Sequence, residues 1–133
     1  MIYLLDSNVC IHLLNGRHTA LIQRFRQYDP RQTVLCSMVK GELLRGALRS
    51  QRVELNLERL AIFFAPLKSL PFDDSAAEHF ARIGAELLKR GTPIGPNDLV
   101  IAATALANQV TLVTHNTDEF SRVPGLRLED WEI

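Results

Sequence analysis

The chain has 133 residues, of which 47% are hydrophobic and 23% are charged, a composition typical of one globular domain over residues 1–133. Lys and Arg together number 15, as do Asp and Glu, so binding of nucleic acid through overall charge is excluded and must depend on local patches. The apolar run at the start has no basic region before it and is interrupted by Asp6, so we expect neither a signal peptide nor a membrane span.

The first half of the sequence predicts two strands, each followed by two helices. Short apolar runs predict the strands, and apolar residues at helical spacing predict the helices. Ser7 or Asn8 can cap the first helix and Gly16 can end it, while Ser37 can cap the third. The predicted strands are residues 2–5 and 33–36, and the predicted helices are residues 7–14, 19–28, 37–48 and 51–64.

The second half predicts three more strands and another pair of helices. Ser75 and Glu78 fit a capping box at the start of a long amphipathic helix, which Gly91 ends. A rigid loop then leads into an apolar helix that starts at about Asn97 or Asp98. The predicted strands are residues 68–70, 110–114 and 126–128, and a short turn or helix covers residues 117–120.

This alternation of strands and helices indicates the α/β class. We expect a central parallel sheet covered by helices on both faces, which is a three-layer α/β/α sandwich. Ligands of such sheets bind at the carboxyl ends of the strands. Cys10 and Cys36 lie in apolar runs without metal-ligand spacing, as expected of reduced core residues in a cytoplasmic protein.

Acidic side chains follow the predicted strands. Asp6 comes directly after the first strand, Glu42 lies about one turn into the helix after the second, and Asp98 opens the apolar helix. Carboxylates gathered at one edge would repel one another, and a divalent cation removes that repulsion. Oxygen ligands suit Mg²⁺ or Mn²⁺, and zinc is not expected because the four histidines show no ligand spacing. The strand that ends at Thr114 is followed by Asn116, Asp118 and Glu119.

Each acid also has a purely structural interpretation. Asp98 can be a helix cap, and Glu42 can be a surface residue paired with Arg45 or Lys40. For Asp6 this interpretation is weakest, because an acid that closes a buried strand has few partners available. The convergence of several acids at one sheet edge favours a functional site.

Four segments resemble PIN-domain ribonucleases and, more closely, the VapC toxins of bacterial toxin–antitoxin pairs. They are "LLDSNV" at the start, "GELLRGA" around Glu42, "PIGPNDLVIAATAL" around Asp98 and "LVTHNTDEFSRVPGLRLEDW" at the end, and they span the chain from Met1 to Trp131. The resemblance implies a compact α/β/α sandwich with a parallel sheet. It also implies a Mg²⁺- or Mn²⁺-dependent endoribonuclease that forms a homodimer and is silenced by a small VapB antitoxin protein.

The resemblance assigns the acidic metal ligands to Asp6, Glu42 and Asp98, and a polar position usually held by Thr to Ser7. The expected reaction is hydrolysis of an RNA phosphodiester by a water that Glu42 positions or deprotonates, with products ending in a 5′-phosphate and a 3′-hydroxyl. At the fourth acidic position many PIN domains have Asp, and this chain has Asn116. The charge could come from a nearby acid, so the ligands of a second metal stay open. The expected catalytic residues are Asp6, Glu42, Asp98, Asn116 and Glu119, with Asp118 as an alternative.

"PIGPND" and "RVPGLRLEDW" look most like the VapC subgroup that cuts the anticodon stem-loop of initiator tRNA, so we expect an RNA substrate, and tRNA in particular. Arg45, Arg49 and Arg52 share a face with Glu42 if the helix continues that far, and with Ser7 they are candidate substrate-binding residues. The alternative is a solvated face on which Glu42 pairs with Arg45.

The segment from Val53 to Phe64 is apolar on more than one side. It is therefore either a deep core helix or a surface for a partner, and the resemblance implies a groove that receives an antitoxin segment. Two other functions compete with the nuclease. One is a phosphatase with Asp6 as nucleophile, although the second acid usual in such sites is replaced by Asn8. The other is a non-catalytic binding module whose acids are helix caps. Metal dependence distinguishes the three.

Overall fold

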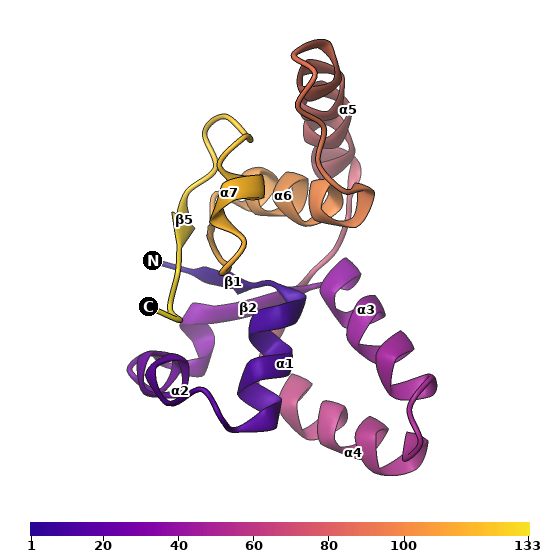
Figure 1. Cartoon of the computed structure of the whole chain (residues 1–133), viewed down its shortest axis with the longest axis vertical. Coiled ribbons are helices and arrows are strands. Elements are labelled where there is room, and N and C mark those ends of the chain that lie inside the picture. Colours follow the sequence, from indigo (N-terminus) through magenta and orange to yellow (C-terminus); the bar gives the residue numbers. More distant parts are fainter.

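A computed structural model describes all 133 residues and contains a five-stranded sheet with helices on both faces (Figure 1). Every pair of neighbouring strands is parallel, and the strand order is β3-β2-β1-β4-β5. The predicted α/β/α sandwich with a parallel sheet is therefore confirmed. The strands are β1 (Tyr3–Leu5), β2 (Thr33–Cys36), β3 (Lys68–Leu70), β4 (Thr111–Val113) and β5 (Leu128–Glu129).

Helices α1 to α4 lie on one side of the strands, and α5, α6 and α7 lie on the other (Figure 1). No helix is both long and apolar enough to cross a membrane. The helices are α1 (Ser7–Asn15), α2 (Thr19–Arg26), the 3-10 helix η1 (Pro30–Gln32), α3 (Ser37–Leu48), α4 (Val53–Phe64), α5 (Asp74–Lys89), α6 (Pro96–Asn108) and α7 (Thr117–Phe120).

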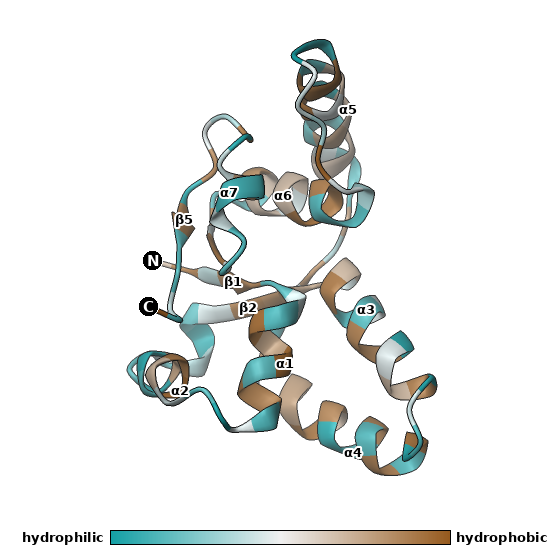
Figure 2. Cartoon of the chain, viewed as in Figure 1, coloured by the Kyte–Doolittle hydropathy of each residue, from teal (hydrophilic) through white to brown (hydrophobic).

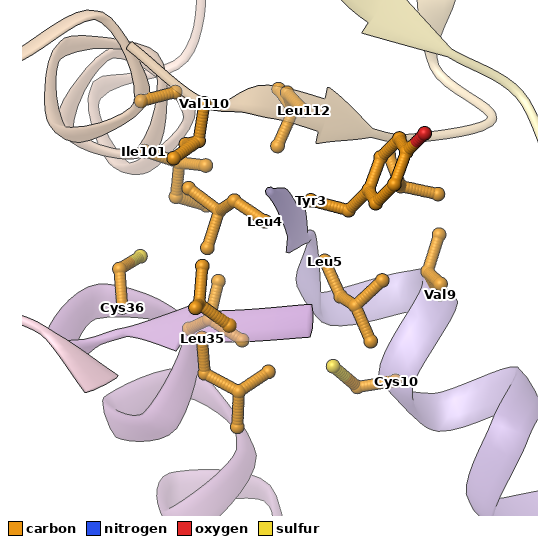
Figure 3. Close-up of a cluster of buried hydrophobic side chains, with 14 of the residues drawn as sticks. Tyr3, Leu4, Leu5, Val9, Cys10, Leu35, Cys36, Ile101, Val110 and Leu112 are labelled. Carbon is orange, nitrogen blue, oxygen red and sulfur yellow. The ribbon is translucent and has the colours of Figure 1, made fainter. Parts of the chain in front are cut away.

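Strand β1 is central because its residues are apolar on both faces and can be buried on both. Leu4 is opposite Val34 of β2 on one side and Leu112 of β4 on the other. Figure 3 shows Leu4 and Leu5 among side chains from β2, β4, α1 and α6. They belong to a core cluster of 26 buried residues. Parallel pairing brings the carboxyl ends of β1, β2 and β4 to one edge of the sheet.

The two cysteines are free and buried, as predicted. Burial raises the pKa of the Cys10 thiol well above its usual value and also raises that of Cys36. Thiols in this environment stay protonated and are poor nucleophiles, which is consistent with a packing role.

The predicted cap of α1 is wrong. The N-cap is Asp6, whose backbone is still extended and whose Oδ1 accepts a hydrogen bond from the Val9 amide at 3.0 Å. Ser7 and Asn8 are already helical, so neither can serve as the cap. The carboxylate that closes β1 therefore also starts α1.

Two further caps differ from the prediction. Ser37 is the first residue of α3, and the N-cap is Cys36, which makes no side-chain hydrogen bond. The N-cap of α5 is Asp73, so Ser75 and Glu78 lie inside the helix and form no capping box. In both places the chain enters the helix earlier than the cap motif suggested.

Several predicted boundaries are shifted by a few residues. The second helix ends at Arg26 rather than residue 28, and α4 begins at Val53 rather than residue 51. The edge strand predicted at residues 126–128 is Leu128–Glu129, because its pairing register with Leu112 and Val113 of β4 places the ladder there.

Candidate active site

Asp6 lies at the carboxyl end of β1 and is only 6% exposed. Its Oδ1 accepts from the Val9 amide, and its Oδ2 accepts a short hydrogen bond from the hydroxyl of Thr114. Burial raises the pKa of this carboxyl, and the two hydrogen bonds oppose that rise. The two hydrogen bonds therefore fix the orientation of the Asp6 carboxylate and offset part of the cost of burying it.

Thr114 follows β4 and is fully buried. Its Oγ1 donates to Asp6 and accepts from the backbone amide of Asn116 at 3.0 Å. Sequence reasoning used Thr114 only as the end of a strand and assigned it no role. The sequence contains a signal for this role, because Thr114 directly follows the strand that pairs with β1 and so lies opposite Asp6.

Glu42 projects from α3 and accepts two hydrogen bonds. Its Oε1 accepts from the Ser7 hydroxyl at 2.6 Å, and its Oε2 accepts from Nδ2 of Asn97 at 3.3 Å. Neither Arg45 nor Lys40 pairs with it, so the ion-pair interpretation of Glu42 is wrong. The structure therefore brings Ser7 and Asn97 to the same carboxylate, and sequence reasoning missed the role of Asn97.

Asp98 lies in the first turn of α6, whose other residues are uncharged and mostly pale or brown in Figure 2. The N-cap of this helix is Gly95, so the interpretation of Asp98 as a cap is wrong. Five consecutive residues of α6, from Ile101 to Ala105, are buried. The packing of this apolar helix fixes Asp98 at the end that faces the other acids.

Glu119 of α7 accepts two hydrogen bonds and lies close enough to Asp98 for the two carboxyls to influence each other's pKa. Its Oε1 accepts from the Gly95 amide at 2.7 Å, and its Oε2 accepts from Nδ2 of Asn116 at 2.7 Å. Burial, followed by the charge of Glu119, raises the pKa of Asp98 to about 7. The Gly95 amide in turn holds the pKa of Glu119 below its usual value. Of the two carboxyls, Asp98 is therefore the one that is protonated more readily.

The four carboxylates of Asp6, Glu42, Asp98 and Glu119 form one electrostatic cluster, because the charges of the other three all contribute to the raised pKa of Asp98. None of the four is in an ion pair with Lys or Arg. Asp118 is exposed and does not contribute to that pKa. The structure thus places Glu119, rather than Asp118, beside the other acids.

No three Asp, Glu, His or Cys side chains are already gathered closely enough to hold a metal ion. The donor set nevertheless fits Mg²⁺ or Mn²⁺, because it consists of carboxylate oxygens that form no ion pair with Lys or Arg. The repulsion between these acids, which helps to raise the pKa of Asp98, is the repulsion that a cation would offset. The residues therefore suit a hard divalent cation in charge and chemistry.

The predicted basic stripe does not lie on one helix. Helix α3 ends at Leu48, Arg49 is its C-cap and Arg52 is the N-cap of α4. Arg45 is exposed on α3 and, like the other two, forms no ion pair. The three guanidinium groups are free for a ligand, but they do not form the single helix face that the spacing predicted.

An apolar groove adjoins Glu42. It has a volume of about 270 Å³ and is bounded by α1, α3 and α4. Leu60 of α4 is buried, whereas Ile62 is 76% exposed, so α4 is not a deep core helix. The apolar residues that line the groove are Ile11, Leu14, Leu43, Ala47 and Leu60.

The chain is similar to known proteins over nearly its whole length. A model of the PIN domain family matches residues 3–126. The chain is 38% identical over 129 residues to the tRNA(fMet)-specific endonuclease VapC of Salmonella typhimurium, covering 97% of each chain. It is 35% identical over 133 residues to Ribonuclease VapC2 of Rickettsia felis, covering 99% of each. The crystal structure of DNA-bound VapBC from Salmonella typhimurium matches with a TM-score of 0.92 at 37% identity, over 98% of both chains.

Proposed function

Because the chain belongs to the VapC family of PIN-domain proteins, we propose that it is a divalent-metal-dependent endoribonuclease and the toxin of a toxin–antitoxin pair. The observation that carries the proposal is the cluster of four carboxylates, unpaired with Lys or Arg, at the carboxyl edge of the sheet. Ligands of parallel α/β sheets bind at this edge, and such donors suit Mg²⁺.

We assign the cation, Mg²⁺ or Mn²⁺, to Asp6, Glu42 and Asp98, with Asn116 and Glu119 shaping the adjoining side of the site. When bound, the cation supplies charge neutralisation at the phosphate and acidification of the attacking water. Burial and the hydrogen bonds of Asp6 keep its carboxylate in one orientation before the substrate arrives. Such preorganisation lowers the cost of reaching the transition state.

Glu42 orients the attacking water and accepts its proton. Each of its oxygens is held by one donor, Ser7 or Asn97, and keeps a further lone pair for the water. Asp98, with its pKa raised to about 7, would give up its proton if a cation were held beside it. The leaving 3′-oxygen takes a proton from solvent, because the rim around Asn116 is exposed.

For the substrate we propose tRNA, and initiator tRNA in particular, cut in its anticodon loop in the cytoplasm to stop translation. A Salmonella relative is named for tRNA(fMet), and RNA loops present the unstacked bases that proteins read. Arg45 and Arg49 are exposed and free to contact phosphates. Ser7 contributes to substrate binding only through Glu42, because its hydroxyl is already bonded to that carboxylate.

The test is incubation of the purified chain with total tRNA, with Mg²⁺ present or removed by EDTA. We expect cleavage of one tRNA species with Mg²⁺, none in EDTA, and 5′-phosphate ends on the products. The Asp98→Asn chain should lose activity by about 100-fold or more while unfolding at a similar temperature. Equal cleavage in EDTA, or an unchanged rate in Asp98→Asn, would refute the assignment.

The same preparations decide between the nuclease and its two rivals. A phosphatase would form an acyl-phosphate on Asp6. A non-catalytic binding module would show neither cleavage nor an acyl-phosphate.

We propose further that the groove beside Glu42 receives a segment of a VapB-like antitoxin and that the chain forms a homodimer. The support is the apolar lining of the groove and the VapBC complex among the similar structures. We expect the isolated chain to associate or aggregate, and the protein from the adjacent reading frame to solubilise it when co-expressed. Sedimentation of the chain as a monodisperse monomer that does not bind this partner would contradict both statements.

A further inference from the structure

We propose that Arg122 is a positioning residue for the carboxylate site, which it serves by fixing the loop of residues 91–95 against α7. The inference rests on the proposed function, because the site in question is the metal site of the nuclease. Arg122 itself is exposed and touches no acid of the site in an ion pair. Its role follows from two hydrogen bonds, one made by its side chain and one made by its backbone amide.

The side chain of Arg122 reaches the loop that precedes α6. Its Nη1 donates to the carbonyl oxygen of Pro93 at 3.0 Å. Its backbone amide donates to the carbonyl oxygen of Glu119 at 3.2 Å. One residue thus joins the backbone that carries Glu119 to the loop that leads to Asp98.

Helix α7 has only four residues and therefore little stability of its own. Two side chains spaced three residues apart, Glu119 and Arg122, hold the same loop from this short element. Glu119 does so through the Gly95 amide, and Arg122 does so through Pro93. Of the two contacts, only the one from Glu119 uses a carboxylate that belongs to the acidic cluster.

The loop matters because Gly95 is the N-cap of α6 and makes no side-chain cap bond. Asp98 follows three residues later, so a displaced loop displaces Asp98. Arg122 therefore adds a second contact, besides that between Glu119 and the Gly95 amide, that holds the loop leading to Asp98 against α7.

The chain offers a matched control at the other end of α6. Nη2 of Arg127 donates to the carbonyl oxygen of Gln109 at 2.7 Å, and Gln109 is the C-cap of that helix. Arg127 is exposed like Arg122, and it makes the same kind of contact. Arg127→Ala therefore removes an equivalent hydrogen bond and an equivalent charge without touching the carboxylate end.

The experiment measures Mn²⁺ binding to the chain by electron paramagnetic resonance, without RNA. We expect Arg122→Ala to weaken Mn²⁺ binding about 10-fold or more, as is typical when an outer contact of a metal site is removed. Arg127→Ala should bind as the wild type does. Arg122→Lys keeps a donor and the charge and should recover most of the affinity. Hydrogen exchange of the peptide covering residues 91–99 should become faster in Arg122→Ala only.

Cleavage assays extend the test. Arg122→Ala should need about 10-fold more Mg²⁺ for half-maximal activity, with a kcat near that of the wild type once Mg²⁺ is saturating. Unchanged Mn²⁺ binding with unchanged exchange would overturn the inference. So would unchanged Mn²⁺ binding with a raised KM for RNA and a salt slope smaller by about 1, which would make Arg122 a phosphate contact. A wild-type chain that neither binds Mn²⁺ nor cleaves RNA would overturn the proposed function itself.

Discussion

The hydroxyl of Thr114 lowers the free-energy cost of burying Asp6, the most buried acid of the site. A buried carboxylate is costly unless it is paired or hydrogen-bonded, and Asp6 has no cation beside it in the free chain. The Thr114 hydroxyl donates to Asp6 and also accepts from the backbone amide of Asn116. The side chain of Asn116 in turn donates to Glu119. One chain of hydrogen bonds therefore runs from the first strand to the fourth acid.

Replacing Thr114 by Val should test this chain of hydrogen bonds. The change keeps the shape but leaves Oδ2 of Asp6 without its donor, while the Val9 amide still donates to Oδ1, so we expect a loss of about 1–3 kcal/mol in the free energy of unfolding and a 10–100-fold fall in kcat. Thr33→Val is the control, because the Thr33 hydroxyl is buried and has no partner. Urea unfolding should show that this control is no less stable than the wild type, and its cleavage rate should be unchanged. Equal losses in both variants would contradict a special role for Thr114.

The raised pKa of Asp98 predicts how stability depends on pH in EDTA. The folded chain holds this proton up to about pH 7, whereas the unfolded chain releases it near pH 4. The stabilising contribution of protonated Asp98 to the free energy of unfolding is therefore fully present below pH 4 and is lost as the pH rises through about 7. Between pH 5 and 8 the free energy of unfolding should fall more steeply for the wild type than for Asp98→Asn. Parallel curves for the two proteins would show that Asp98 titrates normally.

At the level of elements, the apolar runs were enough to predict the three central strands and the three-layer fold, because a buried parallel strand needs apolar residues on both faces. The end of α1 at Gly16 was also predicted correctly, but the N-caps were not, because they depend on where the first helical residue falls; for α1 the extended backbone of Asp6 decides this. The fourth acid was ambiguous for a similar reason. Helix α7 is too short to show periodicity, so only its orientation reveals that Glu119 and not Asp118 faces the site.

Substitutions in helix α4 should distinguish its buried residues from its exposed ones. Leu60→Ala should cost about 2–5 kcal/mol, because Leu60 is buried in the core. Ile62→Ser should change the stability of the isolated chain by no more than about 0.5 kcal/mol, because Ile62 is largely exposed. Ile62→Ser should nevertheless weaken association with a partner or a second copy, as measured by sedimentation. A large loss of stability in Ile62→Ser would show that α4 is buried after all.

On the scale of the whole molecule, the site joins parts of the chain that are remote in sequence. Asp6 comes from the end of β1, Glu42 from α3 after β2, Asp98 from α6 and Glu119 from the segment after β4. The parallel order of the strands brings these segments to one edge of the sheet. A cation bound there would hold four segments together.

Mg²⁺ should therefore stabilise the folded chain as a whole. A ligand that binds only the folded state adds about 2.7 kcal/mol at a concentration 100 times its Kd. The thermal midpoint of the wild type should rise with Mg²⁺ concentration, and that of Asp6→Asn should rise much less. Calorimetry with Ca²⁺-free buffers measures both. Identical midpoints with and without Mg²⁺ would argue against metal binding by the folded chain.

The hydrogen bond between Asp6 and Thr114 spans 108 residues of sequence. Contacts of such long range close late, because the loop entropy between them must be lost first. Asp6 gains its hydroxyl donor only when β4 has docked beside β1, so we expect the complete site to form late in folding. Recovery of cleavage after dilution from urea should therefore follow the slowest step of refolding.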